Sequence, residues 1–112
     1  MSTITRTHEP YLVDLCQRAI KALDEGIKAP PGQEVEPIGK AERTVNQLRD
    51  ALIERLRQDP VEEDFAPLRA NLENVNASLS LLVGVEFPAG AIHRKKLVEA
   101  RRVLKRVKKT FP

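Results

Sequence analysis

The chain has 112 residues, the size of one domain, and 41% of them are hydrophobic. Because only 4% are aromatic and none is tryptophan, the core must be aliphatic. The regularly spaced leucines and valines argue against a disordered chain, and the composition excludes a collagen, a membrane span and a disulfide scaffold. We therefore expect one helical-bundle domain over residues 1–112.

The single cysteine and the first ten residues indicate the compartment. Cys16 cannot form an internal disulfide, so nothing in the sequence requires an oxidising environment. Residues 1–10 lack the apolar stretch of a secretory signal. We expect a soluble cytoplasmic protein.

The first predicted helix runs from about Glu9 to Glu25 and follows a flexible tail at 1–8. Its apolar residues recur at the spacing that lines one helix face: Leu12, Leu15, Cys16, Ala19, Ile20 and Leu23. Pro10 is tolerated in a first turn, and Gly26 or the prolines after it should end the helix. Residues 28–40 hold three prolines and two glycines, so we expect a long loop there.

The second and third helices have the clearest spacing. In the second, predicted at Ala41–Gln58, apolar residues repeat every three or four positions: Ala41, Val45, Leu48, Leu52 and Leu56. The third carries an unbroken seam of Phe65, Leu68, Leu72, Val75, Leu79 and Leu82. Because a proline belongs in the first turn, Pro67 makes Asp64 the expected N-cap and places 61–63 in a separate turn.

The fourth predicted helix follows Gly90 and runs to the end of the chain. Its apolar face carries Leu97, Ala100, Leu104, Val107 and Phe111. Four such helices predict an all-α fold, a four-helix antiparallel bundle with a long Pro/Gly-rich loop between the first two helices. A strand over 81–87 is the alternative, but the sequence offers no second strand to pair with it.

Charge is segregated along the chain, although the net charge is only +3. Residues 93–112 hold nine lysines and arginines against one acid, Glu99, whereas the other 92 residues hold ten bases and fifteen acids. The fourth helix region thus carries +8 and the remainder −5. At 100° per residue, all nine bases except Lys96 fall on an arc of roughly 160° opposite the apolar face.

Three interpretations of this basic face remain open. The protein's own acids, for instance Glu62, Glu63 and Asp64, could balance it within the chain or across a dimer. It could instead bind an acidic protein, or it could bind nucleic acid phosphates, which requires only a row of long cationic side chains. Base recognition is not expected, because no aromatic residue lies among the cations.

A second stripe on the third helix suggests an oligomer. Ala70, Asn74, Ala77 and Leu81 lie about half a turn from the seam. A four-helix monomer of this size does not need this additional face, so we expect a homodimer that covers it. Asn74 is a polar residue among small ones, a pattern that can fix the register between packed helices.

No residue is assigned to catalysis, a metal or a cofactor. His8 lies in the expected tail, and His93 has no partner at the spacing of a helical zinc pair. The carboxylates of residues 62–64 are more simply explained as the start of a helix than as a metal site. Cys16 lies in the middle of a helix, where a thiol is more simply explained by packing than by catalysis. No phosphate-binding glycine pattern is present.

The sequence therefore favours a small non-catalytic protein–protein interaction or regulatory domain that acts as a homodimer. The alternative is a nucleic-acid-binding accessory protein. In both cases the candidate contact residues are Arg94, Lys95, Arg101, Arg102, Lys105, Arg106, Lys108 and Lys109.

Overall fold

The computed structural model describes the backbone of residues 2–58, 62–84 and 91–111, and the side chains of 10–57, 67–84 and 93–111. Four helices occupy these ranges: α1 (Ser2–Lys28), α2 (Val35–Gln58), α3 (Glu62–Val83) and α4 (Ala91–Lys109). No strand occurs in the described backbone, so the prediction of an all-α chain is confirmed there.

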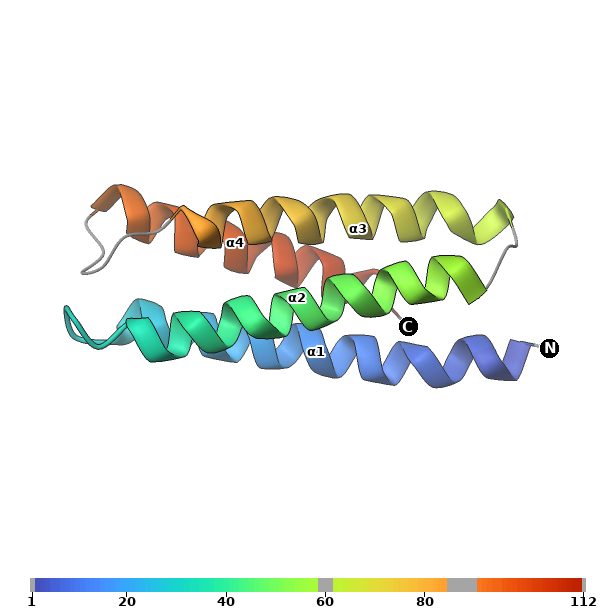
Figure 1. The fold of residues 1–112 in the computed structure, drawn as a ribbon, viewed down its shortest axis with the longest axis horizontal. Helices are drawn as coiled ribbons and strands as arrows, with labels where there is room; N and C mark the ends of the chain where they lie inside the picture. Colours follow the sequence, from blue (N-terminus) through green and yellow to red (C-terminus); the bar gives the residue numbers. More distant parts are fainter. Residues whose placement is uncertain (1, 59–61, 85–90, 112) are drawn as a thin grey trace.

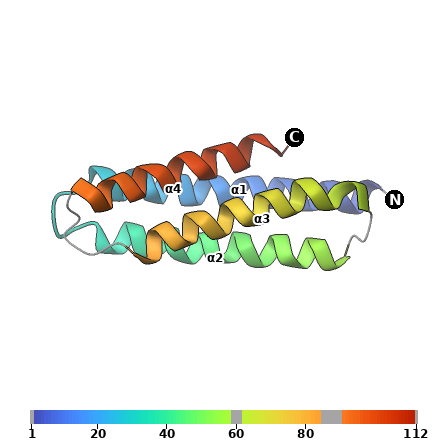
Figure 2. The same ribbon diagram turned by 90° about the horizontal axis from the view of Figure 1, so that it is seen from above.

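The four helices lie side by side along one long axis, and Figures 1 and 2 show consecutive helices running in opposite directions. α1 packs against α2 and α4, and α3 packs against the same two helices. The molecule measures 49 × 19 × 19 Å, so its cross-section is two helices by two. Each helix therefore has one side in the core and one outer side.

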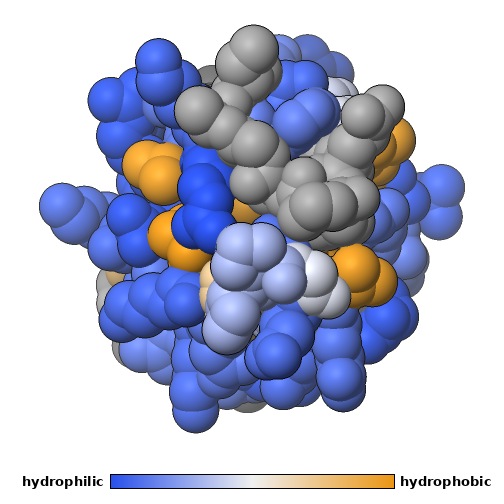
Figure 3. All heavy atoms as spheres, turned by 90° about the vertical axis from the view of Figure 1, so that its left-hand side faces the viewer, coloured by the Kyte–Doolittle hydropathy of each residue, from blue (hydrophilic) through white to orange (hydrophobic). Residues whose placement is uncertain are grey.

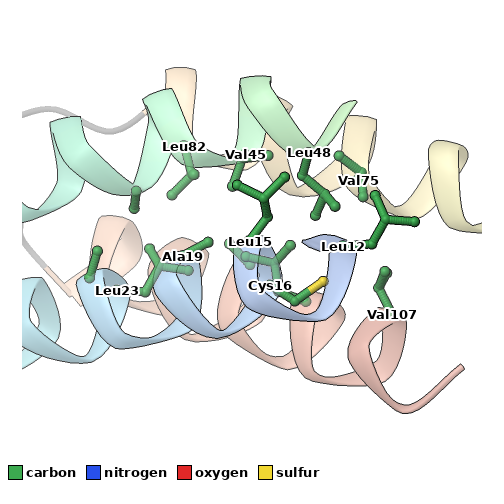
Figure 4. Packing of buried hydrophobic residues seen from close by; sticks show 14 of the residues in the cluster. Leu12, Leu15, Cys16, Ala19, Leu23, Val45, Leu48, Val75, Leu82 and Val107 are labelled. Carbon is green, nitrogen blue, oxygen red and sulfur yellow. The ribbon is translucent and has the colours of Figure 1, made fainter. Parts of the chain in front are cut away.

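The core is a single aliphatic cluster to which all four helices contribute. Figure 4 shows α1 side chains such as Leu12, Leu15 and Leu23 among residues of the other helices. Most residues predicted on apolar faces are buried: Leu12, Leu15, Cys16, Ala19, Leu23, Ala41, Val45, Leu48, Leu52, Leu68, Val75, Leu82, Leu97, Ala100, Leu104 and Val107. Five others are partly buried against this core, namely Ile20, Leu56, Leu72, Leu79 and Phe111, and the side chain of Phe65 lies outside the described part. Helical periodicity thus located most of the core.

α1 is longer at both ends than expected. It begins at Ser2, so the backbone of residues 2–8 is helical instead of forming a tail, and Pro10 lies inside the helix. Pro10 cannot donate a helical hydrogen bond, but it is exposed and the helix continues on both sides of it. α1 continues past Gly26 to Lys28. A glycine that ends a helix commonly has a positive φ, and among the described residues only Gly32 has one, of 92°.

The connection between α1 and α2 spans only residues 29–34, so the loop predicted at 28–40 was too long. α2 starts at Val35, and its first helical hydrogen bond runs from the Ile38 N–H to the Glu34 carbonyl, at 3.0 Å. Pro37 is then the third helical residue, where the N–H has no intrahelical partner to lose. The proline that suggested a loop is therefore part of a helix start.

α3 also begins earlier than predicted, at Glu62, so Asp64 is not its N-cap. Of the separate turn predicted at 61–63, residues 62–63 are helical and Val61 lies outside the described residues. Three acidic residues at 62–64 favour a helix start by opposing the positive end of the dipole. The helix extends to Val83, which contradicts a strand at 81–83, and residues 85–87 lie outside the described part. The predicted seam is shifted: Leu72 and Leu79 are half-buried, whereas Asn71 and Ser78 are buried.

Candidate interaction surface

Two arginines connect α4 to α1. The Arg94 guanidinium donates to the Ile27 carbonyl at 2.7 Å, beside the end of α1. About two turns further along, Arg101 forms an ion pair with Asp24 at 2.6 Å, and both side chains are largely shielded, with 26% and 35% exposed. These contacts fix the rotation of α4 about its axis, with Arg94 and Arg101 on the side next to α1.

Polar contacts with α3 fix the opposite side of α4. The buried amide of Asn71, only 4% exposed, donates from Nδ2 to Oγ1 of Thr110 at 2.8 Å. Ser78 Oγ lies 3.5 Å from the Ala100 carbonyl. With both sides of α4 fixed and its apolar face in the core, the remaining side of the helix must face outward.

The eight predicted contact residues divide into two groups. Arg94 and Arg101 bind α1, and Arg102 pairs with Glu99 at 2.8 Å on the surface. Lys108 is half-buried, and its charge lowers the pKa of Cys16 in part, which places it near α1. The four others are exposed and form no ion pair with the described residues: Lys95, Lys105, Arg106 and Lys109.

Among the described side chains, two acids pair with cations of the basic face. Asp24 and Glu99 neutralise one arginine each, whereas the suggested acids Glu62, Glu63 and Asp64 have side chains outside the described part. We use the name α4 row for the outward cations Lys95, Arg102, Lys105, Arg106 and Lys109.

The predicted oligomer stripe lies on α3 beside α4. Ala70 and Ala77 are exposed, Asn74 is half-buried, and half-buried Leu81 packs against the protein's own core. Nearby, a Cβ added to Gly84 would be 3.3 Å from Nζ of Lys96, so this end of the stripe also adjoins α4.

Large exposed hydrophobic residues are scattered over the described surface: Tyr11, Val35, Val83 and Val98. Val35 starts α2 and Val83 ends α3, so both lie toward the end of the bundle seen in Figure 3. There, the hydrophobic groups of the described residues are separated by hydrophilic ones. This end therefore shows no continuous apolar patch among the residues that can be described.

The described side chains offer little for chemistry. They contain no group of three His, Cys, Asp or Glu residues that could hold a metal ion. Burial raises the pKa of the Cys16 thiol from 9.0 to about 12, and the charge of Lys108 opposes this only in part. A thiol that holds its proton so strongly is a poor nucleophile. Among the helices that the structure describes, none is long and apolar enough to span a bilayer.

Sequence reasoning missed the residues that position the surface. Asn74 was singled out as the register residue, but the buried amide is Asn71, three residues earlier. Arg94 and Arg101 lie at the edge of the cationic arc nearest the apolar face. That position was the available sign that they contact a neighbouring helix.

Comparisons with known proteins give no match to a protein-family profile, a curated protein or a solved structure. The functional argument therefore rests on the arrangement of this chain's own residues.

Proposed function

We propose that this protein is a non-catalytic interaction domain that binds an acidic partner through the α4 row. The observation that carries the proposal is the exposure of Lys95, Lys105, Arg106 and Lys109 on a helix whose other sides are fixed against α1 and α3. The antiparallel bundle serves as a rigid support, and the reduced thiol of Cys16 suits a cytoplasmic protein.

Two charge-reversal variants test this proposal. The α4 variant carries Lys95→Glu, Lys105→Glu and Lys109→Glu. The α2 variant carries Lys40→Glu, Arg43→Glu and Arg57→Glu, three exposed cations on the helix diagonal to α4. Both changes lower the net charge equally, so a difference between the variants reports position and not total charge.

The assay is affinity purification of the tagged wild type and both variants from the cells that produce the protein. Co-purifying proteins and nucleic acids are quantified for each. We expect material that is lost from the α4 variant and kept by the α2 variant. Identical material with all three proteins would show that the α4 row is not the binding surface.

We further propose that the protein is a homodimer that covers the stripe of Ala70, Asn74, Ala77 and Leu81. The exposed residues along α3 from Asn76 to Val83 and the adjoining Gly84 support this, because all of them are uncharged and most are small: Asn76, Ala77, Ser80, Val83 and Gly84. Small uncharged residues allow a second helix to approach closely at little desolvation cost.

Sedimentation at micromolar concentration tests the dimer. We expect a species of twice the chain mass of 12.6 kDa, at both low and moderate salt. Ala77→Arg should return it to the monomer, whereas Gln47→Arg on the exposed side of α2 should not. A wild type that sediments only at 12.6 kDa under both conditions would refute the dimer.

A further inference from the structure

We infer that the α4 row binds the phosphate backbone of a nucleic acid duplex, without reading its sequence. This inference rests on the proposed function, because it names the partner of the same surface. Its support comes from the kind of residues exposed on α4, from their spacing, and from the pairing of the nearby acids.

The residues on the outer side of α4 suit phosphates better than a protein surface. Stable protein interfaces are centred on aromatic or large apolar side chains, and lysine is depleted there. Here three of the five row residues are lysines, and the only large apolar side chain exposed among the described residues of α4 is Val98, at 41%. Phosphate binding needs long cationic side chains and no apolar anchor.

The spacing of the row suits a linear polyanion. Lys95, Arg102 and Lys109 are seven residues apart, so they follow one line along the helix at intervals of about 10 Å. Lys105 and Arg106 lie on either side of that line between its last two residues. The row therefore presents five cations over about 20 Å of a straight helix, to a duplex that carries about one negative charge per 1.7 Å.

Two acids among the described residues pair with arginines of α4. Asp24 accepts from Arg101, and Glu99 accepts from Arg102 in an exposed pair. An exposed pair of this kind contributes little to stability, so Arg102 can exchange Glu99 for a phosphate at small cost.

The experiment measures binding of the purified protein to a fluorescent mixed-sequence duplex of about 20 base pairs by anisotropy, over a range of salt. Contacts to three to five phosphates predict a slope of about −2.7 to −4.5 for log K against log salt, so affinity should fall about 40- to 500-fold between 50 and 200 mM. At about 50 mM salt, the α4 variant should bind more than tenfold more weakly. The α2 variant should stay within about threefold of the wild type, because its reversed charges lie on the diagonal helix.

Poly-glutamate of matched charge and vesicles with anionic lipid serve as alternative polyanions. The inference predicts that the duplex binds more tightly than either, and that the α4 variant loses this preference. Absence of duplex binding at about 100 μM protein and 50 mM salt would overturn it. So would equal weakening of the two variants, or binding of poly-glutamate or vesicles as tight as that of the duplex.

The outcomes separate this inference from the proposed function. If the α4 variant loses an acidic protein in cells while the wild type ignores the duplex, the α4 row is a binding surface and its partner is not a nucleic acid. If neither assay distinguishes the α4 variant from the α2 variant, both proposals fail. Circular dichroism of all three proteins checks that the substitutions leave the helices intact.

Discussion

Replacing Gly26 by alanine should destabilise the bundle, although alanine is the better helix former. Gly26 lies within α1, where an added Cβ would come within 2.7 Å of Ile38 Cγ1 on α2, and closer still to Cδ1. Ile38 is 2% exposed, so its side chain cannot turn into solvent to make room. The added methyl group must therefore push α1 and α2 apart locally or force Ile38 off its rotamer.

The size of the effect follows from two opposing terms. Alanine in place of glycine in a helix gains about 1 kcal/mol, whereas an extra carbon in a packed core costs about 1–3 kcal/mol. The net loss should be about 1 kcal/mol, which lowers Tm by about 4 °C for a chain of this length. Gly39 is the matched control, because a Cβ there meets only Arg43 Nη1 at 3.5 Å. Gly39→Ala should therefore stabilise the protein by about 0.5–1 kcal/mol.

Urea unfolding followed by circular dichroism measures both variants. Ile38→Val removes Cδ1, the atom closest to the added carbon, so Gly26→Ala should cost about 0.5–1 kcal/mol less in that background. If Gly26→Ala stabilised the protein as much as Gly39→Ala does, α1 and α2 would not approach closely at Gly26.

Three further predictions concern side chains that connect helices or lie in the core. Between pH 9 and about 12 the native state keeps the proton of the Cys16 thiol, whereas the unfolded chain loses it. The free energy of unfolding of the wild type should therefore fall relative to that of Cys16→Ala by about 1.4 kcal/mol per pH unit over this range. Urea titrations that give parallel pH profiles for the two proteins would contradict this. Arg101→Ala and Asp24→Ala should each cost about 1 kcal/mol with little added loss in the double variant, and full additivity would exclude a direct pair. Thr110→Val should cost about 1–2 kcal/mol by removing the acceptor of the Asn71 amide, and adding Asn71→Leu should recover part of that loss; no recovery would mean that the amide is not paired with Thr110.

The buried faces of the helices could be predicted because each is recorded in local spacing. Leu12, Leu15, Leu23 and their counterparts on α2 to α4 repeat every three or four residues, and only a helix places such residues on one side. The helix ends could not be predicted in this way. A proline such as Pro37 can belong to a loop or to the first turn of a helix, and a glycine such as Gly26 can end a helix or allow two helices to approach closely. Which of these applies depends on where α2 starts and how closely it approaches α1.

The candidate surface was predicted in part for a similar reason. A projection of the fourth helix identified which cations oppose the apolar face, and Lys95, Lys105, Arg106 and Lys109 are indeed exposed. It could not show that Arg94 and Arg101 bind α1, because their partners are 67 and 77 residues away in the chain. Contacts over such distances depend on tertiary packing, which periodicity alone does not encode.

The pairing of α1 with α4 has a consequence for folding kinetics. Closing the 77-residue segment between Asp24 and Arg101 costs about 2 kcal/mol more in chain entropy than closing a segment of about 10 residues. We expect the helices adjacent in the chain to associate before the barrier and α4 to dock on α1 after it. Weakening that last contact should therefore speed unfolding and leave the folding rate nearly unchanged.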